Sequence, residues 1–167
     1  MSPLPLEDWR DFYVMIGTAS GAIVGASFIV ASLASGVKER TLGMRGFISP
    51  TTVHLASVLV ASAILSVPKI PPAAIALLLG SGGAVGAIYG IIVIMRIWGM
   101  KLGVEDWCFY AILPVVAYGA IAIAAAMIVL HIDSPLYVLA AALILLLIVG
   151  MRNAWDMATF LIMRERE

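Results

Sequence analysis

His54 is the one ionisable side chain that lies well inside an apolar segment of this sequence. An ionisable group in a hydrocarbon environment costs about 3 kcal/mol or more, so it marks a functional site by default. Serines follow it along the segment, on what we expect to be roughly the same helix face: Ser57, Ser62 and Ser66. An imidazole followed by hydroxyls can relay protons or line a hydrated path. In the commoner, structural alternative, His54 donates one hydrogen bond to a neighbouring helix and the serines permit tight packing.

A second set of polar residues lies near the end of the last apolar segment. Arg152 and Asp156 are four residues apart, a spacing at which a helix brings opposite charges together. Asn153 lies between them, and both His54 and Arg96 fall at a similar depth if each segment crosses a membrane. These five side chains are therefore expected to form one polar network. Such a network can act as a gate, a lipid-headgroup site or a structural brace.

The sequence carries no signature of an enzyme. It contains no HExxH, no GxSxG, no phosphate-binding loop and no pair of carboxylates within an apolar segment. One cysteine and two histidines are too few for a metal cage of the usual kinds. The formal net charge is zero, which gives no indication of a nucleic acid partner. We therefore predict a protein that is not an enzyme and that holds no metal or cofactor.

The composition places most of the chain in lipid. Of its 167 residues, 63% are hydrophobic and 12% are charged, whereas a soluble domain is about half apolar and a quarter charged. A chain this apolar cannot cover its surface with polar groups. A hydrocarbon core about 30 Å thick needs roughly 20 helical residues per crossing. We therefore predict an all-α fold, a single transmembrane domain that spans residues 1–167.

Five apolar segments are long enough to be considered as crossings. The predicted spans are about 12–35, 48–67, 72–98, 106–130 and 136–156, and the last continues as a cytoplasmic extension to about 163. Ser49 and Pro50 are expected to open the second span, since serine suits a helix cap and proline suits the first helical position. Pro114 lies inside the fourth span, where it removes a backbone hydrogen bond and should bend the helix.

Glycines recur at intervals of four within two of these spans. The first set is Gly17, Gly21 and Gly25, and the second is Gly82, Gly86 and Gly90. This spacing stacks the glycines on one helix face, where another backbone can approach closely. Within one chain, the first and third spans can pack against each other. Between chains, either set can form the seam of a homo-oligomer, which is the arrangement that we favour.

The basic residues are distributed unevenly between the two sides of a five-span topology. One side holds eight of them: Lys38, Arg40, Arg45, Arg96, Lys101, Arg152, Arg164 and Arg166. The other side holds Arg10 and Lys69. Lys and Arg are enriched in cytoplasmic loops. The pattern therefore predicts an N-terminus outside the cell and a C-terminus inside.

Three segments resemble recurring stretches of a protein family. They are 49–55 (SPTTVHL), Asp106-Trp107 together with Leu113-Pro114, and 150–159 (GMRNAWDMAT). They look like parts of an uncharacterised family of small multi-pass bacterial inner-membrane proteins. The resemblance implies a bacterial origin and a location in the inner, or plasma, membrane. It implies no chemistry.

Two functions remain open at this point. The leading hypothesis is a small oligomeric membrane protein that forms an ion or small-solute pathway, like a channel. The alternative is a non-conducting accessory or scaffold subunit of a larger membrane complex. The expected partners are the lipid bilayer and further copies of the chain, with no nucleic acid and no other partner protein identified.

Overall fold

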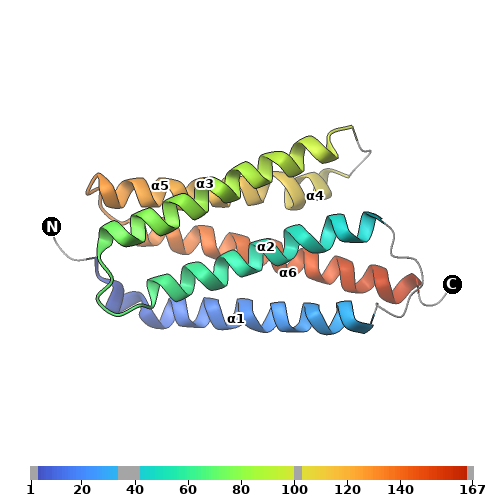
Figure 1. Cartoon of the computed structure of the whole chain (residues 1–167), viewed down its shortest axis with the longest axis horizontal. Coiled ribbons are helices and arrows are strands. Elements are labelled where there is room, and N and C mark those ends of the chain that lie inside the picture. The colour runs from blue at the N-terminus through green and yellow to red at the C-terminus, as the bar shows by residue number, and fades with distance from the viewer. Residues whose placement is uncertain (1–3, 34–41, 100–102, 165–167) are drawn as a thin grey trace.

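The computed structural model describes residues 4–33, 42–99 and 103–164, and their regular structure is entirely helical. The elements are α1 (Leu6–Leu33), α2 (Leu42–Leu65), α3 (Pro72–Ile97), α4 (Val104–Trp107), the π-helical turn η2 (Cys108–Ile112), α5 (Leu113–Val129) and α6 (Pro135–Arg164). Because α4, η2 and α5 follow one another without a break, they form one rod. The described parts of the chain thus build an antiparallel bundle of helical rods (Figure 1).

Four stretches of helix are long and apolar enough to cross a membrane. They are Leu6–Val30, Pro72–Ile97, Val104–Val129 and Pro135–Asp156. These stretches confirm the predicted all-α fold with the helices of a multi-pass membrane protein. Among the residues whose side chains are described, α2 carries a shorter apolar stretch, Pro50–Leu65. Four of the five predicted spans thus coincide with helices long and apolar enough to cross a membrane, and the span boundaries stay a prediction.

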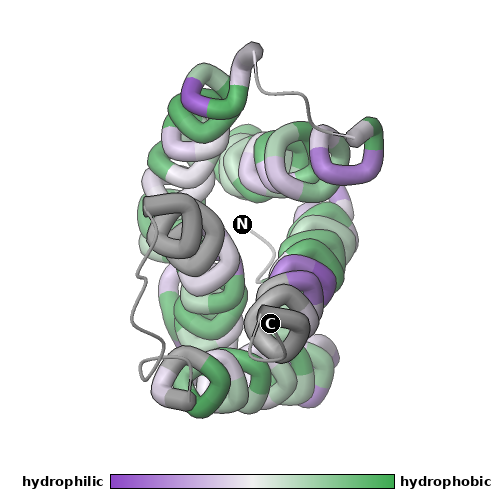
Figure 2. Tube along the Cα trace, turned by 90° about the vertical axis from the view of Figure 1, so that its right-hand side faces the viewer, coloured by the Kyte–Doolittle hydropathy of each residue, from purple (hydrophilic) through white to green (hydrophobic). Residues whose placement is uncertain are grey.

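The helices pack as two pairs joined by α6. Helix α1 lies along α2, and α3 lies along the rod of α4, η2 and α5. Helix α6 contacts α1, α2 and α5, whereas α2 and α3 touch little although they are consecutive. The view along the bundle in Figure 2 shows the rods running side by side and apolar over much of their length. Any site that joins the two pairs must therefore use α6 or a side chain that reaches across.

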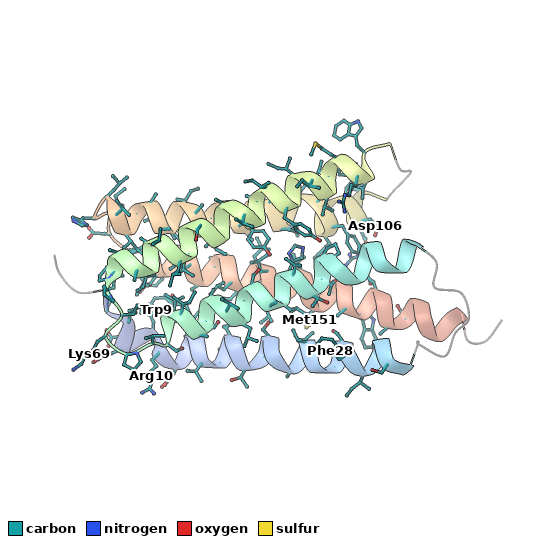
Figure 3. The ribbon with its side chains drawn as sticks, viewed as in Figure 1. Trp9, Arg10, Phe28, Lys69, Asp106 and Met151 are labelled. Atoms are coloured by element: carbon teal, nitrogen blue, oxygen red, sulfur yellow. The ribbon has the colours of Figure 1, made fainter. Side chains whose placement is uncertain are left out.

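The bundle has two ends, which we name after the chain terminus that each carries. Trp9, Arg10 and Lys69 lie at the N-terminal end, and Asp106 lies at the C-terminal end (Figure 3). Arg152 and Arg164 belong to the later part of α6, which runs toward the C-terminal end (Figure 1). The described basic residues are thus separated between the ends as the topology requires. The side of the membrane on which each end lies stays a prediction.

Helix α2 begins earlier than the sequence indicated. The helix starts at Leu42, and Pro50 lies inside it, so the prediction that Ser49 and Pro50 open the span is wrong. Proline lacks an N–H, and its ring crowds the carbonyl four residues earlier. A helix can tolerate one such lost hydrogen bond near its start when the residues before it continue the turn. A local preference for proline at the first helical position did not decide the boundary here.

The rod that contains Pro114 has a π-helical turn just ahead of the proline, where the sequence predicted a bend. Residues Cys108–Ile112 form a π-helical turn, and the N–H of Leu113 donates to the carbonyl of Cys108, five residues earlier. Proline has no N–H with which to continue the usual ladder. A wide turn of this kind accommodates the break by inserting one residue. The perturbation therefore has an identifiable cause in the sequence.

The glycines of α3 allow it to lie close to α5. A Cβ on Gly86 would overlap the ring of Tyr118, and one on Gly90 would lie 2.6 Å from Cγ2 of Val115. A Cβ on Gly83 would lie 2.9 Å from a backbone nitrogen of α5. Gly82, in contrast, is exposed and has nothing within 4 Å of its Cβ position. The contact face of α3 therefore runs through Gly83, Gly86 and Gly90, with Gly82 beside it.

The glycines of α1 face a different helix. A Cβ on Gly17 would lie 2.9 Å from Cβ of Ser62 in α2, and one on Gly21 would lie 3.8 Å from a methyl of Leu59. Gly25 is exposed and has nothing within 4 Å. The expected packing of the first span on the third is therefore replaced by two separate contacts, α1 on α2 and α3 on α5.

Candidate functional site

A group of hydrogen-bonded polar side chains inside the bundle joins α5 to α2. The hydroxyl of Tyr118 lies 3.0 Å from Nδ1 of His54 and 3.1 Å from Oγ of Ser57. The side chains of His54 and Tyr118 are each 1% exposed. We call these three residues the Tyr118 node. The node brings two of the four predicted pathway residues together around a residue that the sequence analysis did not select.

Glycine on α3 makes the position of Tyr118 possible. The tyrosine ring occupies the space that a side chain at Gly86 would take. Since α2 and α5 are not packed closely along their lengths, the long phenol side chain is what spans the distance between them. Three helices thus fix the node: α3 supplies the space, α5 the phenol, and α2 the imidazole and the serine. The one sequence signal for Tyr118 was an aromatic hydroxyl in a stretch of small apolar residues, because a buried tyrosine hydroxyl needs a partner.

Counting protons gives the hydrogen bonds of the node a direction. Ser57 donates to the carbonyl of Val53 at 2.8 Å, which uses its one proton. Its oxygen must then accept from the Tyr118 hydroxyl, which uses the one proton of the phenol. The Tyr118 oxygen therefore accepts from Nδ1–H of His54. This chain assigns His54 as the neutral Nδ1–H tautomer, with a bare lone pair on Nε2.

Several buried polar atoms lie without a hydrogen-bond partner in the described part of the chain. They are Nε2 of His54, Oγ of Ser62, both amide atoms of Asn153, and Nη1 of Arg152, whose contact with Asp156 at 3.4 Å is an ion pair without hydrogen-bond geometry. Leu55 of α2 packs against Gly150 of α6. His54 is next to Leu55, and Asn153 is three residues after Gly150, so each lies within about 4.5 Å of that contact along its helix axis. The open side of His54 and the unpaired amide therefore occupy neighbouring levels of the bundle. Such groups cost about 1–3 kcal/mol each, which makes them exceptions that need an explanation.

The serines of α2 do not share one face, contrary to our expectation. Ser57 faces Tyr118 of α5, whereas Ser62 lies against Gly17 of α1. Ser66 donates to the backbone carbonyl of Ser62 at 2.8 Å. Five residues separate Ser57 from Ser62, a rotation of about 140° on a helix. Only Ser57 therefore joins His54 in a polar site.

A charged cluster lies on the surface near the C-terminal end. Arg152 of α6 forms ion pairs with Glu105 of α4 at 3.1 Å and with Asp156 at 3.4 Å. Its guanidinium also lies over the ring of Phe109, 4.1 Å from the ring centroid. We call these four residues the Arg152 cluster. The predicted pairing of Arg152 with Asp156 is confirmed.

The larger network expected from the sequence does not assemble. Among the described residues, Arg96 is exposed and makes no ion pair with the Arg152 cluster. His54 bonds to Tyr118 instead, and Asn153 is buried without a partner. Depth along the helix axis was predicted, but the direction in which each side chain points around its helix was not. Two separate polar sites result.

Two hollows accompany these sites. A mostly apolar cleft of about 360 Å³ lies between α1, α2 and α6, with Ile23, Thr51 and Trp155 in its lining. A second hollow of about 290 Å³ lies at the N-terminal end and includes Trp9 and His131. Neither is lined by His54, Ser57 or Tyr118.

No group of three or more His, Cys, Asp or Glu side chains in the described residues is placed to hold a metal ion.

No family model, curated protein or solved structure matches this chain. The resemblance to small bacterial inner-membrane proteins therefore stays a prediction, together with the membrane and organism that it implies. The fold itself defines the class: a helical protein with the spans of a multi-pass membrane protein and a neutral polar node inside its bundle.

Proposed function

We propose that the chain forms a pathway for an ion or small solute through the membrane, with the Tyr118 node as its polar step. The observation that carries the proposal is a buried imidazole, hydrogen-bonded through one nitrogen and open at the other. Polar groups inside a membrane bundle are costly and tend to mark transport routes or relays. His54 and Tyr118 are buried inside the bundle, and Ser57 is half-buried at its edge.

The surroundings of the node suggest how such a pathway is closed. Toward the N-terminal end the interior is filled by apolar side chains, among them Leu65, Ile75 and Leu139. Toward the C-terminal end lies the unpaired amide of Asn153. The pathway therefore has a polar half and an apolar half. A constriction of apolar side chains can exclude ions until it opens.

We also propose that the protein works as a homo-oligomer, oriented with its N-terminus outside and its C-terminus in the cytoplasm of a bacterial cell. Gly25 and Gly82 are exposed and have nothing within 4 Å within the chain. These positions remain open for close contact with a second copy. Cross-linking in native membranes through single cysteines at Ala26 and Val85, in a Cys108→Ser background, tests this contact. A chain that stays monomeric at all concentrations contradicts the oligomer.

The pathway is tested by flux measurements in liposomes. We expect purified protein to speed the movement of at least one of protons, K⁺, Na⁺, Cl⁻ or a small neutral solute, and His54→Ala to return this movement to the background of empty vesicles. A folded preparation through which none of these species moves contradicts the proposal. His131→Ala is the matched control, because it removes the other histidine, at the N-terminal end of the bundle.

One observation favours the alternative, a non-conducting accessory or scaffold subunit. The apolar cluster that fills the N-terminal half has many side chains that are almost fully buried, such as Leu139 and Leu143. A sealed half of this kind suits a bundle that braces a larger complex. Co-purification of a partner in fixed proportion from native membranes would support this function. Retention of that partner by His54→Ala would show that the node is not needed for it.

A further inference from the structure

We propose that the species moved is the proton, and that His54, Tyr118 and Ser57 relay it. This inference rests on the proposed pathway and narrows it to one substrate class. It starts from the direction of the hydrogen bonds, in which His54 donates to Tyr118 and Tyr118 donates to Ser57. Every donor in this chain points the same way, and the first member carries a buried lone pair on Nε2.

The step that this arrangement allows balances in protons and needs no electrons. A proton binds Nε2 of His54, and the proton on Nδ1 passes to the oxygen of Tyr118. The phenol proton passes at the same time to Oγ of Ser57. Ser57 then passes its own proton, which it had donated to the carbonyl of Val53, to a water molecule at its half-buried hydroxyl. One proton has entered and one has left, and rotation of the three groups restores the starting state.

The same residues are poorly suited to a dehydrated metal cation. Hard cations need several oxygen ligands, commonly carboxylates or rings of carbonyls. The node offers two hydroxyl oxygens, each already engaged, and one imidazole nitrogen. No carboxylate contacts it among the hydrogen bonds and ion pairs of the described residues. A hydrogen-bonded relay thus matches the groups present, whereas an ion-coordination site does not.

Asn153 supplies a second observation on the entry side of the relay. Its amide is 1% exposed, and both of its polar atoms lack a partner in the described part of the chain. It is near the level of His54 through the contact of Leu55 with Gly150. An amide offers both donors and an acceptor. It can therefore orient a water molecule toward Nε2 of His54, which gives Asn153 the role of a positioning residue.

The test compares ion species and variants in the same liposomes. With an internal pH dye and an imposed K⁺ potential, we expect proton flux to exceed Na⁺ and Cl⁻ flux at least tenfold. Tyr118→Phe removes one hydroxyl from the relay and should lower proton flux at least tenfold, and Ser57→Ala should lower it similarly. Tyr137→Phe is the matched control, because Tyr137 is exposed, at 66%, and lies outside the node, and we expect no change.

Nuclear magnetic resonance tests the relay without any flux. In a His131→Gln background, His54 is the one remaining histidine, so ¹⁵N-histidine labelling reports on it alone. We expect the Nδ1–H tautomer in the parent protein and a mixture of tautomers in Tyr118→Phe. This readout tests the hydrogen bond from Nδ1–H to the Tyr118 hydroxyl, on which the first step of the relay depends, independently of flux.

The outcomes separate the two proposals. Movement of Na⁺, K⁺ or a neutral solute without protons overturns the relay and leaves the pathway standing. Proton flux that Tyr118→Phe and Ser57→Ala leave unchanged, in folded protein, also overturns the relay alone. Movement of no species at all overturns both. The Nε2–H tautomer in the parent protein would contradict the direction of the hydrogen bonds on which the relay depends.

Discussion

The Tyr118 node and the Arg152 cluster are built on opposite principles. The node consists of neutral hydrogen bonds between two buried side chains, His54 and Tyr118, and the half-buried Ser57. The Arg152 cluster carries full charges near the end of the bundle, and its Glu105 side chain is 84% exposed. Charges are costly where water cannot reach them, while neutral polar groups are tolerated if they bond to one another. The comparison teaches that burial separates the polar residues of this chain that join through neutral hydrogen bonds from those that join through ion pairs.

The contact between Gly86 and the ring of Tyr118 is where a substitution should disrupt the node most strongly. We expect Gly86→Ala to lower the free energy of unfolding by about 3 kcal/mol, because its methyl would overlap the ring of Tyr118 and overpacked sites cost about this much. Gly119→Ala is the control, at a helical position in α5 where nothing lies within 4 Å of the Cβ position. It should be neutral or stabilising by up to about 1 kcal/mol, since alanine favours helix. Unfolding in mixed detergent, followed by circular dichroism, measures both, and equal effects would contradict the packing.

Loss of the hydrogen bonds of the node should have the next largest effect on the free energy of unfolding. Tyr118→Phe keeps the ring against Gly86 but leaves Nδ1 of His54 and the oxygen of Ser57 without the phenol hydroxyl. We expect a loss of about 1–2 kcal/mol in the free energy of unfolding, within the range for such bonds in proteins and membranes. The same unfolding assay measures it. No loss would mean that the bonds are replaced, and would weaken the contrast with the charged cluster.

Replacement of Asn153 should raise the free energy of unfolding, whereas the substitutions at Gly86 and Tyr118 should lower it. Asn153→Leu has a similar volume and removes two unpaired buried atoms. We expect a gain of about 1 kcal/mol in stability, since such atoms are expensive to bury. The relay predicts that proton flux falls in the same variant. A loss of stability would instead show that the amide has a partner.

The Arg152 cluster should give the smallest effect. Arg152→Gln removes two ion pairs, one of them with an exposed glutamate. Exposed pairs contribute about 0.5 kcal/mol, and salt screens them. We therefore expect a small loss of stability at low ionic strength that shrinks as NaCl is added. A large loss that salt does not reduce would show that this cluster is as important to the fold as the node.

The sequence predicted the long apolar helices and the ion pair between residues four positions apart. The lengths of the apolar segments located four membrane-length helices, and the spacing of Arg152 and Asp156 gave their ion pair. Pro114 indicated the perturbed rod. These features depend on residues that are near one another in the chain. A rule based on local spacing therefore suffices for them.

Rules based on local spacing could not predict the long-range contacts that form the Tyr118 node and the Arg152 cluster. Tyr118 is 64 residues from His54, and Glu105 is 47 residues from Arg152. Their contacts depend on which helices become neighbours and on how each one is turned about its axis. The uneven packing, with α2 and α3 barely touching, could not be derived from the order of the spans. Glycine spacing identified Gly86 as a packing position but not the tyrosine that fills the space.

The wide turn at Cys108–Ile112 has a consequence for how this rod tolerates insertion and deletion. A π-helical turn holds one residue more than an α-helical one, so everything before it is out of phase with everything after it by about 100°. Removing a single residue there would bring the two parts of the rod into phase, while Pro114 would still interrupt the hydrogen-bond ladder. It would also swing Glu105 and Phe109 away from Arg152 while leaving Tyr118 in place. The turn thus allows the charged end and the buried relay to be adjusted independently of each other.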